Sequence, residues 1–265
     1  MFFIFLINII IPVIAGVLYF VMAYEINKIG KVRKIIFDEI GYKKISNVFL
    51  LFGIYFITRP LQNLIGQHPW PMIINNLRQF FLMGIISPLI LVGIFYWDSN
   101  EQKLSKSTTI TAYIVGIFMA VIFILVNSAA INGSTEIASI GNIKLYDAVW
   151  FSDGHERTQL ILIHLIVQFI SPVGFLILST AIVRSKRHNY PAGSIYNLMP
   201  LKWKYLEAGL IVFIVSLIIA GFAAILGRYY TYIWVIYFIG AIISGMIELK
   251  SVMIPPRSAP EDLKI

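Results

Sequence analysis

Four polar residues lead into a long apolar stretch at spacings of seven, four and three positions: Arg157, His164, Gln168 and Ser171. In an α-helix these spacings place all four side chains on one face. Polar groups inside a bilayer are costly, so they usually face a cavity or a partner group. The stripe therefore predicts either a binding pocket open to the outer surface or hydrogen bonds between neighbouring helices.

Arginines extend this polar layer. Arg59 and Arg78 stand near the outer ends of two neighbouring apolar stretches, and Arg228 follows a third. Guanidinium groups at one depth can bind a carboxylate or a phosphate bidentately. Alternatively, they pair within the protein or extend to the lipid headgroups. Acidic partners for such pairing stand in the longest outer segment: Asp147, Asp153 and Glu156.

Histidine offers a second kind of chemistry, because His68, His155 and His164 all fall on the predicted outer side. Two histidines that face the membrane interior can ligate a haem iron. Only His164 lies inside an apolar stretch, whereas His68 lies in a turn, so a pH-sensing imidazole is a simpler use of His164. The chain has no cysteine and no recognised metal-site spacing. The cofactor is therefore left undetermined, with haem as one alternative.

Seven apolar stretches must position these side chains. Hydrophobic residues make up 58% of the 265 residues and charged residues 13%, which is outside the soluble range. Because a bilayer core takes about 20 apolar residues per helix, little chain remains for a soluble catalytic domain. We expect an all-α membrane protein, a seven-transmembrane helix bundle, with a short tail after the last helix. The predicted spans are residues 2–24, 48–64, 73–97, 109–126, 159–183, 208–226 and 231–253, with an outer cap at 127–158 and the tail at 255–265.

The basic residues are distributed unevenly between the two sides of this bundle. If the connecting segments alternate sides, sixteen of the 21 Lys and Arg residues fall on one face. Basic residues are retained on the cytoplasmic side during insertion, which predicts the N-terminus outside and the C-terminus inside. The net charge of +8 flanks apolar spans, so membrane lipids, and not nucleic acid, are the expected partner.

Prolines recur in the three spans that run from outside to inside: Pro12, Pro88 and Pro172. The surrounding sequence is alike in two of them, Ile86-Ser87-Pro88 and Ile170-Ser171-Pro172. A proline within a helix leaves a carbonyl free, and this carbonyl needs a partner inside the bundle. The pattern indicates either a repeat of parallel helical hairpins or proline occurring by chance. Kinks at these sites could open the outer half of the bundle into a cavity.

Two connecting segments have features of their own. Short β-rich pieces on both sides of Gly141-Asn142 predict a small hairpin that caps the bundle. After the first span, apolar residues recur at helical spacing within a basic segment, residues 28–44. That segment is either an amphipathic helix on the cytoplasmic leaflet or a solvated loop.

The layout resembles the seven-transmembrane input regions of bacterial sensor kinases and related receptors, which have an external N-terminus, a capped outer pocket and an internal C-terminus. The resemblance covers almost the whole chain. It is one of architecture without a motif, so it transfers no functional residues. It implies an integral, multi-pass protein of the bacterial cytoplasmic (inner) membrane. Those proteins normally continue into a signalling domain, whereas this chain stops after Ile265, so the output is expected on a partner or on a longer receptor.

We therefore expect a membrane sensor or receptor for signal transduction, with no catalytic activity of its own. It would bind a small ligand in an outward-facing pocket and act on a cytoplasmic or membrane protein partner. The alternatives are a redox subunit with haem or quinone, a transport subunit, or a scaffold. No catalytic or metal-binding residue and no oligomeric state is predicted. The candidate ligand-binding residues are Arg59, His68, Arg78, Arg157, His164, Gln168 and Ser171.

Overall fold

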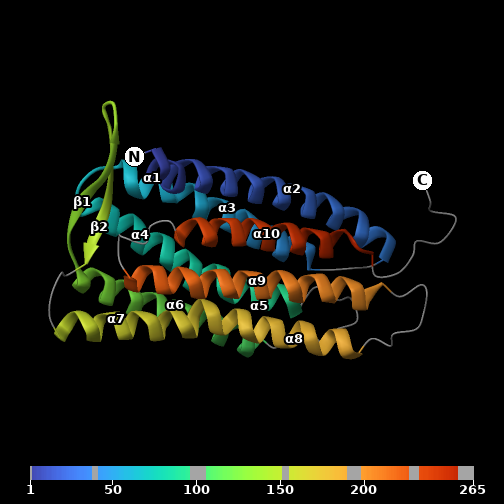
Figure 1. Ribbon diagram of the computed structural model, residues 1–265. Helices are drawn as coiled ribbons and strands as arrows, with labels where there is room; N and C mark the ends of the chain where they lie inside the picture. The colour runs from blue at the N-terminus through green and yellow to red at the C-terminus, as the bar shows by residue number, and fades with distance from the viewer. Residues whose placement is uncertain are drawn as a thin grey trace.

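Long helices that lie side by side form most of the molecule (Figure 1). The computed structural model describes residues 2–37, 41–95, 106–150, 155–189, 198–226 and 233–255. Within these residues the chain forms seven helical rods and one hairpin. Three of the rods contain a short π-helical segment, labelled η. The rods are α1 (Phe2–Phe5), η1 (Leu6–Ile10) and α2 (Ile11–Phe37); α3 (Tyr42–Leu64); α4 (Trp70–Phe80), η2 (Phe81–Ile86) and α5 (Ser87–Phe95); α6 (Lys106–Ala130); α7 (His155–Gln168), η3 (Phe169–Gly174) and α8 (Phe175–Asn189); α9 (Met199–Leu226); and α10 (Ile233–Met253).

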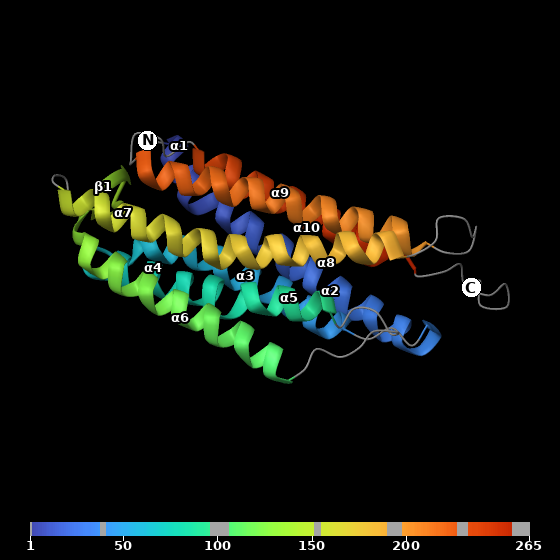
Figure 2. The same ribbon diagram turned by 90° about the horizontal axis from the view of Figure 1, so that it is seen from below.

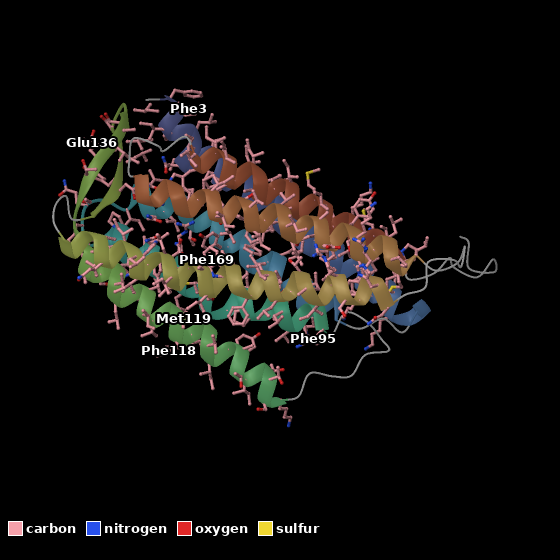
Figure 3. All side chains as sticks on the ribbon, turned by 60° about the horizontal axis from the view of Figure 1, so that its bottom comes forward. Phe3, Phe95, Phe118, Met119, Glu136 and Phe169 are labelled. Atoms are coloured by element: carbon pink, nitrogen blue, oxygen red, sulfur yellow. The ribbon has the colours of Figure 1, made fainter. Side chains whose placement is uncertain are left out.

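Six of the described helices are long and apolar enough to cross a bilayer, which fits an integral multi-pass membrane protein. They cover Phe2–Lys34, Trp70–Phe95, Lys106–Ala130, Gln159–Asn189, Met199–Gly221 and Ile233–Met253. The 23-residue helix α3 is not among them, because Arg59, Gln62 and Asn63 lower the hydropathy of its last turns. Large apolar side chains also cover the outside of the bundle, as lipid requires. Figure 3 labels one of them, Phe118 of α6, which is 58% exposed.

The two ends of the bundle differ in structure and in charge. Helix α1 and the β-strands lie at one end, and the ends of α8 and α10 lie at the other (Figures 1 and 2). We call the first the hairpin end; among the described residues, its rods and hairpin carry Arg59, Arg78 and Lys144. The opposite end, here called the basic end, holds the remaining described lysines and arginines whose side chains are placed: Lys28, Lys31, Arg33, Lys34, Lys43, Lys44, Lys106, Arg184, Lys186, Arg187, Lys202, Lys204 and Lys250.

The hairpin predicted around Gly141-Asn142 is confirmed. Strands β1 (Ile131–Ile140) and β2 (Ile143–Trp150) pair antiparallel, and Ile140 faces Ile143 across the two-residue turn. Gly141 has φ +58°, which suits glycine in such a turn. Two hydrogen bonds tie the hairpin to α3 and to the turn after it. Asn63 Nδ2 donates to the Tyr146 carbonyl at 2.8 Å, and the His68 N–H donates to Ser134 Oγ at 2.7 Å.

The basic segment after the first span is neither a separate amphipathic helix nor a loop over most of its length. Helix α2 runs without a break from Ile11 to Phe37, and α3 already begins at Tyr42. The two helices therefore extend beyond the predicted spans. The predictions for Asp153, Arg228 and the tail beyond residue 255 fall outside the described residues, and so do the side chains of His155, Glu156 and Arg157.

The three prolines distort their helices, as predicted. The π-helical segment η1 ends two residues before Pro12, η2 ends two residues before Pro88, and η3 contains Pro172. At Ser171 the backbone leaves the helical region, with φ −142° and ψ 120°. A π-helical turn bonds each N–H five residues back, and such turns often occur at functional sites.

An aromatic core connects α2, α3 and α9 between the two ends. The Tyr19 ring lies 5.4 Å from the rings of both Phe49 and Phe52, and Phe52 meets Phe213 edge-to-face at 5.1 Å. These rings are buried, and such pairs add to the stability that burial provides. This core fixes one half of the bundle, while the distorted segments η2 and η3 lie in the other rods.

The close packing of α6 against the distortion at Pro88 depends on Gly116. A Cβ at this position would lie 2.6 Å from Pro88 Cγ and 2.7 Å from the Met83 carbonyl oxygen. We expect Gly116→Ala to lower the free energy of unfolding by about 1–3 kcal/mol, because backbone and proline ring cannot give way. Gly84→Ala is the matched control, since its Cβ would meet only ordinary contacts at 3.6 Å. Thermal melting of both variants in detergent checks this, and equal melting temperatures would contradict it.

Candidate functional site

A layer of buried polar side chains lies in the hairpin half of the bundle, and Arg78 is near its centre. Arg78 is 5% exposed. Its Nη1 donates to Gln62 Oε1 at 2.7 Å, and its Nε donates to the Tyr55 carbonyl at 3.2 Å. The guanidinium carbon also lies 4.5 Å from the centre of the Tyr55 ring. The cation therefore holds α4 against α3 and fixes the Tyr55 ring.

Arg59 occupies the next part of this layer. Its Nη2 donates to Asn8 Oδ1 at 3.1 Å and lies 3.8 Å from an Asp147 carboxylate oxygen of β2. The guanidinium carbon also lies 5.6 Å from the centre of the Trp234 ring. The predicted pairing of an outer arginine with Asp147 is thus confirmed. Through Arg59 the first rod, α3, the hairpin and α10 meet at one charged group.

Amide side chains continue the layer toward α6. Asn76 Nδ2 donates to Ser128 Oγ at 3.0 Å, and Asn127 Nδ2 donates to Asn76 Oδ1 at 2.5 Å. Asn76 and Asn127 are both buried. Sequence reasoning did not select these residues or Gln62. In the sequence each of them is a polar residue at the end of an apolar stretch, and many surface residues occur in the same setting.

Ser171 joins the two rods whose prolines stand in similar sequence. In η2 the Ser87 N–H bonds to the Leu82 carbonyl, and Pro88 has no N–H. In a π-helix the Met83 carbonyl would accept from residue 88, and in an α-helix from residue 87. Neither N–H is available here, so the carbonyl lacks a backbone donor from these two positions. Ser171 Oγ of η3 donates to that carbonyl at 3.2 Å. A carbonyl freed by one proline is thus satisfied by the serine that precedes another.

A small cavity of about 40 Å³ lies where these distorted segments meet α3, α9 and α10. Gln168 lines it, so one residue of the predicted stripe does face an internal space. Its polar and aromatic wall also includes residues that were not selected from the sequence. The residues of this wall are Tyr55, Gln79, Gln168, Trp234 and Tyr237.

The other predicted site residues do not line this cavity. His164 is 6% exposed, and its ring centre lies 4.6 Å from that of Phe123 on α6. His68 is exposed in the turn after α3, where it contacts the hairpin. Arg59 and Arg78 contact residues that line the cavity: Arg59 lies against the Trp234 ring, and Arg78 lies against the Tyr55 ring. Arg157 belongs to α7, but its side chain is outside the described part of the chain.

The chemistry that this arrangement can perform is binding. The cavity wall offers amides, phenols and an indole, which donate and accept hydrogen bonds but do not act as nucleophiles at neutral pH. No group of three or more metal-binding side chains occurs among the described residues. The two predicted haem-ligating histidines, His68 and His164, do not line this space.

Comparisons with known proteins found no match to this chain. No family model, no curated protein and no solved structure matches it. The geometry of its own residues therefore has to support any proposal about its function.

We expect Ser171→Ala to destabilise the fold by about 1–3 kcal/mol, because the buried Met83 carbonyl would lose its donor. The matched control is Ser216→Ala in α9. Ser216 is also buried, but its hydroxyl donates at 2.7 Å to Val212, four residues back in its own helix. That carbonyl keeps its helical N–H donor. Melting curves of the two variants in the same detergent check the difference, and an equal loss would show that Ser171 has no special role.

Proposed function

We propose that this protein is a sensor module of a bacterial cytoplasmic membrane. It binds a small ligand in the cavity beside Gln168 and passes the resulting change to a protein partner at the basic end. In this proposal α3 is a seventh span, the hairpin end is external, and the basic end is cytoplasmic. The proposal depends above all on one observation, the position of the cavity between η2 and η3.

Both distorted segments contribute to the cavity wall. Leu82 belongs to η2, and Pro172 and Val173 belong to η3. A ligand in this space contacts two segments with irregular π-helical backbone, a feature that often occurs at functional sites. In this proposal the two segments exchange between two hydrogen-bond registers. A ligand shifts such an equilibrium only by binding one state better than the other, and a wall made of the switching segments provides that difference.

The change has a direct route to the basic end. Helix α8 continues from η3 along the bundle (Figure 2) and carries Arg184 and Arg187 near its end. Both bind Glu207 of α9, at 2.7 and 2.6 Å. The side chain of Arg184 is 61% exposed. A shift of α8 against α9 therefore moves cationic groups that a cytoplasmic partner can contact.

The arginines of the polar layer act as positioning residues in this proposal. Arg78 fixes Tyr55, and Arg59 lies against Trp234. Because each cation also bonds to neighbouring rods, the aromatic walls of the cavity stay in place while the distorted segments shift. The hairpin bonds to α3 from outside and covers this end of the layer.

Orientation is tested by labelling with a membrane-impermeant thiol reagent, which a chain without cysteines makes simple. The charge difference between the two ends supports a cytoplasmic basic end. We expect Ser185→Cys on α8 to react only after the membrane is opened. Ser139→Cys on β1 should react in intact cells. Labelling of both positions from the same side would contradict the seven-span topology.

Coupling is tested by the distance between spin labels at Ser107→Cys on α6 and Ser185→Cys on α8. In lipid nanodiscs, we expect at least one molecule from a panel of small polar metabolites to shift this distance. The shift should disappear in Gly221→Leu, because this side chain would fill the cavity that Gly221 lines.

The control pair for this experiment is Lys28→Cys on α2 and Met253→Cys on α10, two rods that pack together. Its distance should stay unchanged. A Ser107–Ser185 distance that no molecule alters, or that still shifts in Gly221→Leu, would overturn the proposed function.

A further inference from the structure

Among the residues that the structure describes, the wall of the cavity beside Gln168 carries no charge. The described lining residues are amides, aromatic residues, apolar residues and a glycine, and no acidic or basic side chain is among them. Phe169, which follows Gln168, marks the level of the cavity along the bundle in Figure 3. A charged molecule placed here would lose its hydration without contacting an opposite charge on a described lining residue, which is unfavourable.

The two arginines behind the wall do not change this. The Nε and Nη1 groups of Arg78 donate to Tyr55 and Gln62, and Arg59 contacts Asn8 and Asp147. An anion that entered the cavity would have to break these bonds to reach a guanidinium group. Breaking a hydrogen bond of a buried group costs about 1–3 kcal/mol, so these bonds oppose the movement of either guanidinium group toward an anion in the cavity.

The side chain of Gln79 indicates which hydrogen-bonding group a ligand in this cavity must carry. Its Oε1 is buried and has no hydrogen-bond partner among the described residues. Buried acceptors in native proteins are nearly always paired with a protein group, a water or a ligand. The missing partner is therefore a donor, an N–H or an O–H. Gln168 Oε1 faces α9 at Gly221, where a Cβ would lie 3.5 Å away, so glycine keeps space beside the second amide.

We propose that this site takes a small, neutral molecule of the amide or urea class. Its N–H donates to Gln79, and its carbonyl accepts from the Gln168 amide, because carboxamides pair with carboxamides through both groups. The flat molecule lies against the rings of Trp234 and Tyr237. A cavity of 40 Å³ has room for about three waters, which limits the ligand to a few heavy atoms. This inference rests on the proposed function for the location of the site.

Three probes of nearly the same shape test the class of ligand: acetamide, acetate and acetamidinium. Their binding to the full chain in lipid nanodiscs is measured by ligand-observed nuclear magnetic resonance titration. We expect acetamide to bind at least about tenfold more tightly than either ion, because each ion loses favourable hydration when it enters a neutral site. Gln79→Leu should weaken acetamide binding about five- to tenfold through the loss of one acceptor.

Asn75→Leu is the matched control, since Asn75 stands on the same helix but does not line the cavity. It should leave acetamide binding unchanged. Tighter binding of acetate or acetamidinium, or acetamide binding that is absent or unaffected by Gln79→Leu, would overturn the proposed ligand class.

The two proposals can fail separately. If acetamide binds as expected but leaves the Ser107–Ser185 distance unchanged, the ligand class stands and the sensor function falls. If acetamide does not bind while a charged molecule of the panel shifts that distance, the sensor function stands and the ligand class falls.

Discussion

The Met83 carbonyl is the group on which the arrangement of the distorted rods depends. Pro88 removes the donor that a π-helical turn would supply, and the Ser87 N–H is already bonded to Leu82. In an apolar environment an unpaired carbonyl is too costly to leave. Ser171 supplies the missing donor from another rod, and Gly116 lets α6 approach the same carbonyl. Three rods are therefore held at one backbone atom.

This constraint also accounts for the cavity. Regular helices pack by fitting ridges of side chains into grooves, and the π-helical turns of η2 and η3 interrupt those ridges. Where the two segments come together beside α9 and α10, a space remains between the rods. The same feature that satisfies a carbonyl thus leaves a small cavity between the rods.

The charged side chains and the neutral cavity wall form two separate layers of this site. Arg59 and Arg78 are buried, but their bonds run to α3, the first rod and the hairpin. The rings that the two arginines contact, Trp234 for Arg59 and Tyr55 for Arg78, line the cavity instead. The cations therefore fix the position of the wall without giving it a charge. The polar groups of the cavity wall are then neutral ones: the amides of Gln79 and Gln168 and the aromatic side chains of Tyr55, Tyr237 and Trp234.

Much of the fold could be predicted from the sequence, because each feature had a local signal. Apolar stretches predicted the helices, Gly141-Asn142 predicted the hairpin, and Pro12, Pro88 and Pro172 predicted the distortions. Helix α2 runs beyond the predicted span, because the basic residues after Tyr24 do not stop a helix. Continuing a helix beyond the apolar stretch costs little where its charged side chains reach water.

The candidate site could be predicted only in part. Spacing selected Gln168 and Ser171; in the structure Gln168 lines the cavity and Ser171 bonds to the Met83 carbonyl. The partner of Ser171 is a backbone carbonyl, which no residue type reveals. Gln79 stands next to Arg78 in the sequence. The charge of the arginine is the stronger signal, and it favours the prediction of an anion-binding site. Only the folded contacts show that Arg78 bonds to Gln62 and leaves Gln79 with the free acceptor.

A density map of the protein in a lipid nanodisc, at a resolution that shows ordered waters, would examine the space between η2 and η3. We expect density for water or a small molecule within hydrogen-bonding distance of Gln79 Oε1, with Ser171 Oγ still bonded to the Met83 carbonyl. A map in which the Gln79 amide bonds directly to a protein donor and side chains fill the space would contradict a ligand site between the distorted rods.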